Sequence, residues 1–401
     1  MSSPRVIFVN RVYWPSEAAT AQLLTDLCEG LAASGWEVLA IAAGDHTGPQ
    51  RGVQIHRAGC GDRHRGMISR VVNYLGFTRA ARNRLNELVQ PGDIVVLMTD
   101  PPLLAPCLAG FVRKRGAQLV HWIQDIYPEI AMLHAGVWSR PVLTPWRIRR
   151  DWAWRNSDRC VVVGNDMRLT LEAAGAGAHT LCCPNWAPQE LEQPADSAKV
   201  AALRREWGMA DKFLAVYSGN LGRVHEFETI LGAAAQMKQD RDLLFVFIGE
   251  GARYQEVRRS AQQRGLTNVY FLPPQPRMRL RSALAAADVH FVTQLPGYEC
   301  LVNPSKLAGV LAAGRPAIWI GPTASANAGL LERTGSGIAV ATGDYELLAR
   351  TLAHWKADPS ELQQRGLSAR LCYRDHFTFP AALQFWQMLL RALADSGSLQ
   401  T

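Results

Sequence analysis

Residues 297–316 have the sequence Gly-Tyr-Glu-Cys-Leu-Val-Asn-Pro-Ser-Lys-Leu-Ala-Gly-Val-Leu-Ala-Ala-Gly-Arg-Pro. The rest of the chain is interpreted here as arranged around this segment. The apolar run at 288–293 predicts a strand before it, and the Leu and Val spacing after Lys306 predicts a helix. Glu299, Ser305 and Lys306 are therefore expected where a strand ends and a helix begins. In a parallel sheet this edge binds anions, because the first helical N–H groups are free and the helix dipole is positive there.

A lysine in the first turn of a helix opposes the helix dipole unless an anion lies between them. A diphosphate bound by Lys306 meets this requirement, and it would be stabilised by the same lysine when it departs in a reaction. The alternative is a solvated lysine on an ordinary helix.

The segments Pro-Ser-Lys-Leu and Leu-Ala-Ala-Gly-Arg-Pro, with Gly-Tyr-Glu upstream, resemble the nucleotide-sugar site of retaining glycosyltransferase family 4. They are most similar to its branch of bacterial colanic-acid and fucosamine-transferase-like enzymes of polysaccharide biosynthesis. The family usually has two glutamates at the positions that Leu301 and Gly309 occupy here, so Glu299 is the candidate for one of their roles. The resemblance implies an α/β fold of the GT-B type, with two Rossmann-like domains whose parallel sheets face each other across a cleft.

The bulk properties predict an ordinary globular protein with an anionic partner. The 401 residues are 48% hydrophobic and 19% charged, with a formal net charge of +8. This length favours about two domains, and this composition excludes a disordered chain. We expect no signal peptide and no membrane span. The eight cysteines lack metal-ligand spacing, so we expect a reduced cytoplasmic protein without a metal.

Alternation of short Val, Ile and Leu runs with helical stretches predicts two mostly parallel sheets. We expect an amino-terminal acceptor-side domain at 1–186, a linker at 187–200 and a nucleotide-sugar-binding domain at 201–377. The resemblance implies that a last helix, at about 378–401, crosses back to the first domain. The predicted strands are Val6–Val9, Glu37–Ala42, Val53–His56, Ile94–Met98, Gln118–Trp122, Arg159–Val163, Thr180–Cys183, Phe213–Tyr217, Leu243–Ile248, Val269–Leu272, Val289–Thr293, Ala317–Ile320 and Gly337–Ala341.

The donor side is expected to include the loop at 217–226, where Gly219 and Gly222 allow a close approach to a diphosphate. A plain strand–helix turn is the alternative. Family members usually have Arg and Lys at the places of Asn220 and His225, so Arg223 is the candidate for the missing charge. The resemblance further implies that Gly249, Glu250 and Pro273 flank the nucleotide base. UDP is the expected nucleotide, and GDP is left open.

The acceptor side is expected on loops of the first domain. Ser16, Glu17 and Thr20 follow the first strand, although Glu17 is equally explained by helix capping. The segment 121–129 resembles the "HWxQDxxPE" stretch of the family branch. His121 and Asp125 are therefore candidates for contacting the transferred sugar or orienting the acceptor hydroxyl, against the alternative of a structural His–Asp hydrogen bond. Asp100 and Glu129 complete this predicted wall.

Two basic, aromatic segments favour contact with an anionic membrane surface, namely Arg63–Arg84 and Trp138–Arg155. The alternative is that their apolar residues are ordinary core. A lipid-linked saccharide acceptor and a peripheral location on the inner face of the cell membrane would follow from such contact.

The expected reaction transfers a hexosyl or N-acetylhexosaminyl group from a nucleotide-sugar with retention, without a cofactor, a metal or an enzyme nucleophile. Two competing functions are a UDP-sugar 2-epimerase-like enzyme of the same fold and a non-catalytic membrane-surface scaffold. Nucleic acid is not expected as a partner, since the basic residues cluster with tryptophans and no nucleic-acid motif is present.

Overall fold

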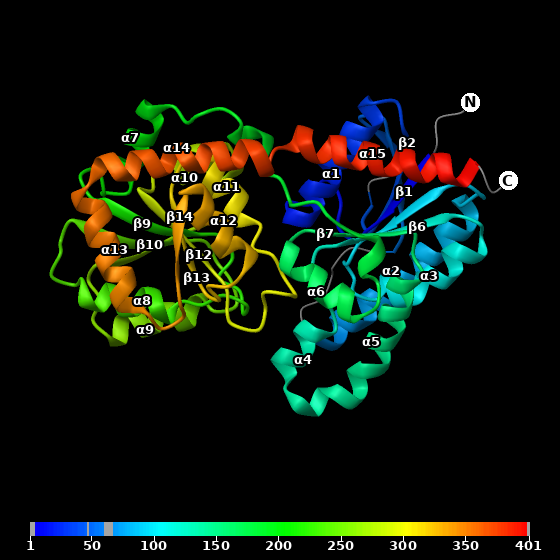
Figure 1. The fold of residues 1–401 in the computed structure, drawn as a ribbon, viewed down its shortest axis with the longest axis horizontal. Coiled ribbons are helices and arrows are strands. Elements are labelled where there is room, and N and C mark those ends of the chain that lie inside the picture. The colour runs from blue at the N-terminus through cyan, green and yellow to red at the C-terminus, as the bar shows by residue number, and fades with distance from the viewer. Residues whose placement is uncertain (1–4, 46–47, 60–66, 399–401) are drawn as a thin grey trace. The chain divides into compact units, whose positions relative to one another are not determined.

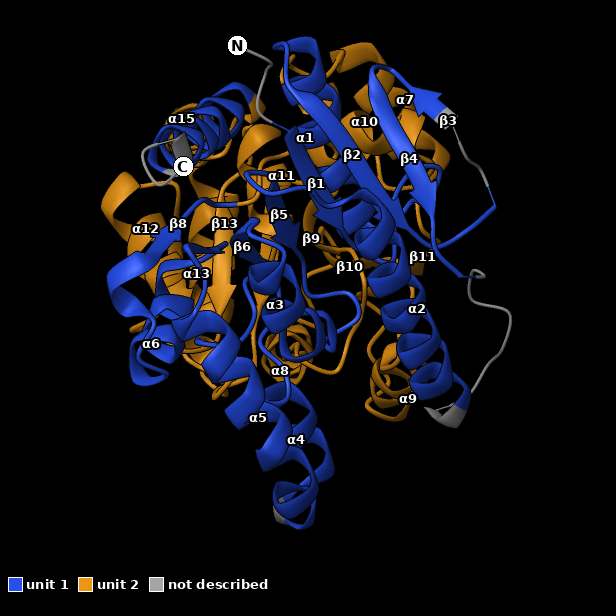
Figure 2. Cartoon of the chain, turned by 90° about the vertical axis from the view of Figure 1, so that its right-hand side faces the viewer, with its two compact units in different colours: residues 1–184, 300–303, 380–401 blue, residues 185–299, 304–379 orange. Residues whose placement is uncertain are grey.

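The computed structural model describes residues 5–45, 48–59 and 67–398. It divides the chain into two compact units, drawn in different colours in Figure 2. Unit 1 comprises residues 1–184, 300–303 and 380–401, and unit 2 comprises residues 185–299 and 304–379.

Unit 1 is built on an eight-stranded sheet with the order β3-β4-β2-β1-β5-β6-β7-β8. All neighbours are parallel except β3, a three-residue strand that the sequence did not predict and that runs antiparallel to β4. Val, Ile and Leu dominate the central strands because helices bury both faces of such a sheet. The strands are β1 (Arg5–Val9), β2 (Glu37–Ala42), β3 (Gly48–Gln50), β4 (Val53–Arg57), β5 (Ile94–Leu97), β6 (Gln118–Ile123), β7 (Arg159–Val162) and β8 (Thr180–Cys182).

One face of this sheet packs against α2 and α3 through a single apolar cluster. Ile7 and Val9 point into this cluster, so Phe8 between them points to the opposite face. There it meets Trp386 of α15, whose ring also contacts Trp122 at a centroid distance of 5.0 Å. The helices of unit 1 are α1 (Ala19–Ala33), α2 (Met67–Leu88), α3 (Leu104–Lys114), α4 (Glu129–Ala135), α5 (Arg140–Arg155), α6 (Asn165–Ala173) and α15 (Phe379–Ser398).

Unit 2 contains a six-stranded parallel sheet with the order β11-β10-β9-β12-β13-β14 (Figure 1). Its strands are β9 (Phe213–Ser218), β10 (Leu243–Ile248), β11 (Val269–Leu272), β12 (Val289–Thr293), β13 (Ala317–Ile320) and β14 (Gly337–Val340). Its helices are α7 (Ser197–Glu206), α8 (Glu228–Gln236), α9 (Tyr254–Gln263), α10 (Leu280–Ala285), α11 (Lys306–Ala312), α12 (Ala326–Thr334), α13 (Tyr345–Ala357) and α14 (Pro359–His376).

The boundary between the units differs from the predicted linker at 187–200. Unit 2 begins at Asn185, and Leu191 is buried in a core cluster with residues of α11 and α14. Helix α7 begins at Ser197, where the Asp196 side chain accepts a hydrogen bond from the Ala198 N–H. The Pro-rich composition predicted a loop, but side-chain packing and this helix cap make the segment part of unit 2.

Each sheet has one point where the strand order reverses. In unit 1 the chain builds outward from β1 through β2 and then returns to β5 beside β1. In unit 2 it builds from β9 through β10 and β11 and returns to β12 beside β9. Ligands of open α/β sheets bind at the carboxyl ends of the strands at such points. The two candidate sites are therefore the β1/β5 edge and the β9/β12 edge.

Candidate functional site

At the β9/β12 edge of unit 2, glycines allow two loops to lie in direct contact. The Gly219 N–H donates to the Ile248 carbonyl at 2.9 Å, and the Leu221 N–H donates to the Glu250 carbonyl at 2.8 Å. A Cβ on Gly249, whose φ is +137°, would lie 2.2 Å from the Gly219 oxygen. Only glycine tolerates this approach and this backbone conformation. The predicted glycines Gly219 and Gly249 thus shape one surface.

Lys306 is the first residue of α11, and its side chain returns to this surface. The Nζ atom lies 3.8 Å from the centroid of the Tyr217 ring and donates a hydrogen bond to the Tyr217 hydroxyl. A Cβ on Gly219 would lie 3.6 Å from the same Nζ. Lys306 forms no ion pair with a carboxylate in the described residues. Desolvation lowers the pKa of this partly buried amine below its usual value, because the ammonium form loses part of its hydration.

Tyr217 is a residue of this surface that sequence reasoning missed. It is fully buried at the end of β9, and its hydroxyl donates to the Asn220 carbonyl at 2.7 Å. Burial raises its pKa, so the phenol stays protonated and its oxygen accepts from Lys306. The only sequence signal was a tyrosine two residues before Gly219 at a strand end.

His225 also belongs to this cluster. Its Nδ1 lies 2.7 Å from the Thr293 carbonyl, which can only accept, so Nδ1 carries a proton. Burial, with a smaller contribution from Lys306, lowers the pKa of the imidazole to about 3. Arg223, the predicted substitute for the missing charge, is instead exposed and forms no hydrogen bond or ion pair with another described residue. Of these two residues, His225, which occupies the position where the family usually has a lysine, lies in the cluster around Lys306, and Arg223 does not.

The other predicted donor residues lie around the same edge, mostly in contact with solvent. Asn220, Glu250 and Ser305 are exposed at loop positions, whereas Gly222 is buried. Pro273 is exposed after β11 and accepts a hydrogen bond at its carbonyl from Gln275.

Glu299 is partly buried in the loop after β12. Its Oε2 atom is buried and has no hydrogen-bond partner among the described residues. An unsatisfied buried carboxylate oxygen is unusual and is expected to bind a donor group, such as a hydroxyl.

At the β1/β5 edge of unit 1, an arginine holds one of two neighbouring carboxylates. Arg11 binds both oxygens of Asp100, at 2.9 and 3.1 Å. Asp125, after β6, has a pKa raised to about 6, mainly by burial and further by the Asp100 carboxylate. Asp125 also forms an isolated β-bridge with Val302, a residue of the 300–303 segment that packs within unit 1. This edge therefore presents one carboxylate paired with Arg11 and one whose pKa is raised by burial to about 6.

His121 does not share this edge with Asp125, contrary to the predicted pair. It lies within β6 and is 1% exposed, with a pKa lowered to about 3 by burial. Its imidazole interacts with the Ala153 backbone and not with Asp125. Side chains alternate along a strand, and the alternation directs His121 toward α5. The structure therefore places it in the core, away from solvent and from a substrate.

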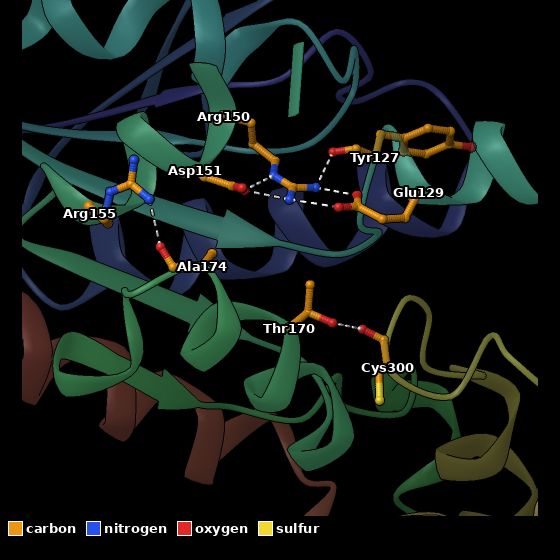
Figure 3. A network of polar contacts seen from close by, with 8 residues as sticks. All are labelled: Tyr127, Glu129, Arg150, Asp151, Arg155, Thr170, Ala174 and Cys300. Carbon is orange, nitrogen blue, oxygen red and sulfur yellow. Dashed lines mark hydrogen bonds and ion pairs between the residues drawn. The ribbon is translucent and has the colours of Figure 1, made fainter. Parts of the chain in front are cut away.

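Glu129 is occupied by a buried ion-pair network, shown in Figure 3. The Arg150 guanidinium binds both Glu129 oxygens, the Tyr127 carbonyl and the Asp151 carboxylate. It also lies 3.9 Å from the centroid of the Trp154 ring. Glu129 thus ties the start of α4 to α5 instead of facing an acceptor.

The remaining acceptor-side residues surround the start of α1. Ser16 and Glu17 are exposed, and Thr20 is partly buried. The Ser16 hydroxyl accepts from the Ala18 N–H at 3.3 Å, and the Glu17 carbonyl accepts from Gln22 at 2.9 Å. Both contacts are local helix-start interactions, and they leave the Glu17 carboxylate at the surface.

The two basic, aromatic segments expose much of their apolar surface. In Trp138–Arg155, which covers α5, Trp138 is 94% exposed and Trp146 and Trp152 are also exposed, whereas Trp154 and Arg150 are buried. Helices α4 and α5 extend beyond the sheet of unit 1 in Figures 1 and 2. In Arg63–Arg84, residues 63–66 lie outside the described residues. In α2, which follows them, the exposed large apolar residues among those with described side chains are Val71, Val72 and Leu75.

No helix in the described part of the chain is long and apolar enough to cross a membrane. In the same residues, no group of three or more His, Cys, Asp or Glu side chains is placed to hold a metal ion.

Both halves of the chain match glycosyltransferase family models. Residues 200–370 match the model described as glycosyl transferases group 1, and residues 19–186 match the glycosyl transferase 4-like domain. The putative colanic acid biosynthesis glycosyl transferase WcaI of Escherichia coli K12 is 35% identical over 254 residues, 62% of this chain and 62% of that protein. The probable glycosyltransferase WbjE of Pseudomonas aeruginosa is 27% identical over 273 residues, 67% of each chain. The match to WcaI thus spans less than two thirds of that relative.

Solved structures share the fold over nearly the whole chain. HepE of Anabaena in complex with UDP has a TM-score of 0.73 at 15% identity, covering 97% of this chain and 100% of that chain. Sucrose-phosphate synthase of Thermosynechococcus elongatus has a TM-score of 0.78 at 17% identity, covering 98% of this chain and 100% of that chain. These likenesses show the GT-B fold, with two α/β domains built on parallel sheets.

Proposed function

Because the chain belongs to glycosyltransferase family 4, we propose that it transfers a sugar from a nucleotide-sugar, preferably a UDP-sugar, to a lipid-linked glycan. The reaction would serve bacterial surface polysaccharide synthesis and retain the anomeric configuration. The observation that carries this proposal is the Lys306 amine, held beside Gly219 at the strand-order reversal of unit 2 with no carboxylate partner among the residues that the structure describes. A diphosphate supplies the missing negative charge.

On the donor side, negative charge grows on the diphosphate as the bond to the sugar breaks. A cation already fixed at that place stabilises the transition state without first having to reorganise. Lys306 supplies it, and the N–H groups at the start of α11 add to it. The unsatisfied Oε2 of Glu299 is assigned to a donor hydroxyl. The bound complex of HepE with UDP supports UDP as the first nucleotide to test.

On the acceptor side, Asp125 is assigned to the incoming hydroxyl or to the transferred sugar. Its raised pKa near 6 leaves the carboxylate ionised at neutral pH but poorly solvated, so hydrogen-bond donors are attracted to it. Retention then requires no enzyme nucleophile, because the departing phosphate accepts the acceptor proton. No step in this scheme uses a metal, and nucleotide release is expected to continue in EDTA.

The lipid-linked acceptor is inferred from the exposed surface of α5. Tryptophans next to arginines favour the interface of an anionic bilayer, where the ring is buried and the guanidinium meets phosphate. The rings are provided by Trp138, just before α5, and by Trp146 and Trp152 within it, and Arg140, Arg147 and Arg149 also lie in α5. Such contact would place the enzyme on the inner face of the cell membrane as a peripheral protein.

The donor assignment is tested by nucleotide release from UDP-glucose, UDP-galactose, UDP-N-acetylglucosamine, GDP-mannose and GDP-fucose, with and without a detergent-solubilised bacterial lipid extract. We expect release from one donor, increased by the extract and lost in Lys306→Ala. Lys199→Ala, a change at an exposed lysine of α7, is the matched control and should keep full release. Absence of UDP and GDP binding in calorimetry would reject the enzyme and favour a scaffold. Conversion of a UDP-sugar to its epimer without an acceptor would instead indicate the 2-epimerase.

The membrane assignment is tested by co-sedimentation with vesicles of phosphatidylglycerol and phosphatidylcholine. Replacing Trp138, Trp146 and Trp152 together by Ser is expected to weaken binding to the anionic vesicles by about tenfold. Met278→Ser is the control, since Met278 is 98% exposed but lies in unit 2. Equal binding of both variants would place the membrane contact elsewhere.

A further inference from the structure

Four residues of the loop between β12 and α11 belong to unit 1, although the rest of this loop belongs to unit 2. These residues, called segment 300–303 below, follow Glu299 and precede Pro304, which are both part of unit 2. The glutamate assigned to a donor hydroxyl is therefore joined by a peptide bond to a residue that is held in unit 1. The contacts that hold segment 300–303 also restrict the backbone of Glu299.

The first contact of segment 300–303 is made by a threonine side chain of α6. The Thr170 hydroxyl donates a hydrogen bond to the Cys300 carbonyl at 3.0 Å, as Figure 3 shows. The Ile126 N–H, after β6, donates to the Leu301 carbonyl at 2.8 Å. Both bonds bind carbonyl oxygens of the segment, so they fix its backbone. The bond from Thr170 acts on the residue directly after Glu299.

The last contact of the segment is made by an asparagine side chain that fits closely against unit 1. The Asn303 Nδ2 donates to the carbonyl of the buried Val163 at 2.7 Å. A Cβ on Gly164 would lie 3.1 Å from the Asn303 Cγ, so the absence of a side chain at Gly164 makes room for this amide. Removing the amide would take a hydrogen-bond donor from a buried carbonyl, which is costly. Segment 300–303 is thus held at both of its ends.

We propose that Thr170 and Asn303 are positioning residues for the donor sugar: they hold segment 300–303, and this hold keeps the Glu299 carboxylate where it meets a sugar hydroxyl. This inference rests on the proposed function and concerns the same site. A loop that is already fixed in the free protein does not have to be ordered when the sugar binds. The nucleotide should not depend on this hold, because the residues that follow Lys306 in α11 are buried in a core cluster of unit 2.

The experiment compares the KM for the donor with the Kd for the free nucleotide in the full-length protein. The donor is the one of the five nucleotide-sugars named above that the wild type uses best, and the free nucleotide is its UDP or GDP. Thr170→Val and Asn303→Ala should each raise the donor KM about fivefold, as expected for one lost hydrogen bond, and leave the nucleotide Kd nearly unchanged. Thr170→Ser keeps the hydroxyl and should behave as the wild type. Thr25→Val is the matched control, since it removes a hydroxyl that donates to the Ala21 carbonyl at 2.8 Å within α1.

A double-mutant cycle tests whether the effect passes through Glu299. In Glu299→Ala the carboxylate is already missing, so adding Thr170→Val should raise the donor KM no further. An unchanged KM in Thr170→Val, an equal loss of nucleotide affinity, or full additivity with Glu299→Ala would overturn the inference while the donor assignment stands. Absence of nucleotide release from every donor in the wild type would instead overturn the proposed function itself.

Discussion

Asp125→Asn is expected to stabilise the fold while it abolishes sugar transfer. The substitution keeps the shape of the side chain and removes its negative charge. It leaves the backbone contacts of this loop intact, including the hydrogen bond from the Ile126 N–H to the Leu301 carbonyl at 2.8 Å. Any change in stability therefore reports the cost of the buried charge.

The magnitude follows from the raised pKa of Asp125, from an ordinary value of 3.8 to about 6. One pKa unit corresponds to about 1.4 kcal/mol, so ionising Asp125 at pH 7 costs up to about 3 kcal/mol of unfolding free energy. The folded protein binds more protons than the unfolded chain between about pH 4 and 6, so this cost grows as the pH rises through that range. The Asn variant does not incur it.

The assay is thermal unfolding of both proteins from pH 4 to 8, followed by tryptophan fluorescence, which reports on Trp122, Trp154 and Trp386 in unit 1. We expect equal melting temperatures near pH 4 and a variant that melts roughly 5–10 °C higher at pH 7. The exposed Asp45→Asn is the matched control and should show no such difference. A pH-independent gap, or a destabilised variant at pH 7, would refute the reasoning.

Three further outcomes are expected. The pKa of the buried His290 is lowered to about 4, so its imidazole stays neutral in the folded protein while the same group takes up a proton in the unfolded chain. The free energy of unfolding should therefore fall as the pH drops from about 6.5 to 4. Urea unfolding of His290→Gln should show a smaller fall, and an unchanged pH dependence would contradict a neutral, buried His290. Gly249→Ala should abolish UDP binding, because its Cβ would lie 2.2 Å from the Gly219 oxygen. Gly208→Ala, also at positive φ but with no atom within 4 Å of the added Cβ, should keep UDP binding. Calorimetry compares the two variants, and retained binding in Gly249→Ala would argue against a UDP surface formed by Gly219 and Gly249. Trp386→Ala should lower the free energy of unfolding in urea by about 3–5 kcal/mol. Met388→Ala, at a 64% exposed site on the same helix, should leave it nearly unchanged. Similar losses in the two variants would mean that α15 does not anchor unit 1.

Much of the donor edge was predictable because its residues follow strand and helix ends in sequence. Gly219 and Gly249 close strands of β-branched and aromatic residues, and Lys306 begins a helix that Gly314 ends. These signals are local, since they depend on φ values, helix caps and apolar periodicity. They placed the predicted strands of both sheets within about two residues.

The residues that were misplaced depend on contacts that no local signal contains. His121 and Asp125 are four residues apart, yet His121 lies within β6 in the core, whereas Asp125 lies beyond the end of that strand, at the edge of the sheet. Glu129 pairs with Arg150, 21 residues away, which removes it from the acceptor side. A charged residue on a loop offers the same sequence pattern whether it meets a substrate or a buried arginine.

Two α/β units with glycine-rich strand ends could therefore be predicted from the amino-acid sequence, since those properties follow from periodicity and backbone sterics within short segments. The pairing of β9 with β12, which brings Tyr217 to Lys306, 89 residues later, is visible only in the folded chain. That contact holds the amine beside Gly219, where no carboxylate of the described residues pairs with it. The place of this amine beside Tyr217 and Gly219 depends on side chains and backbone that come together only once the strands have paired.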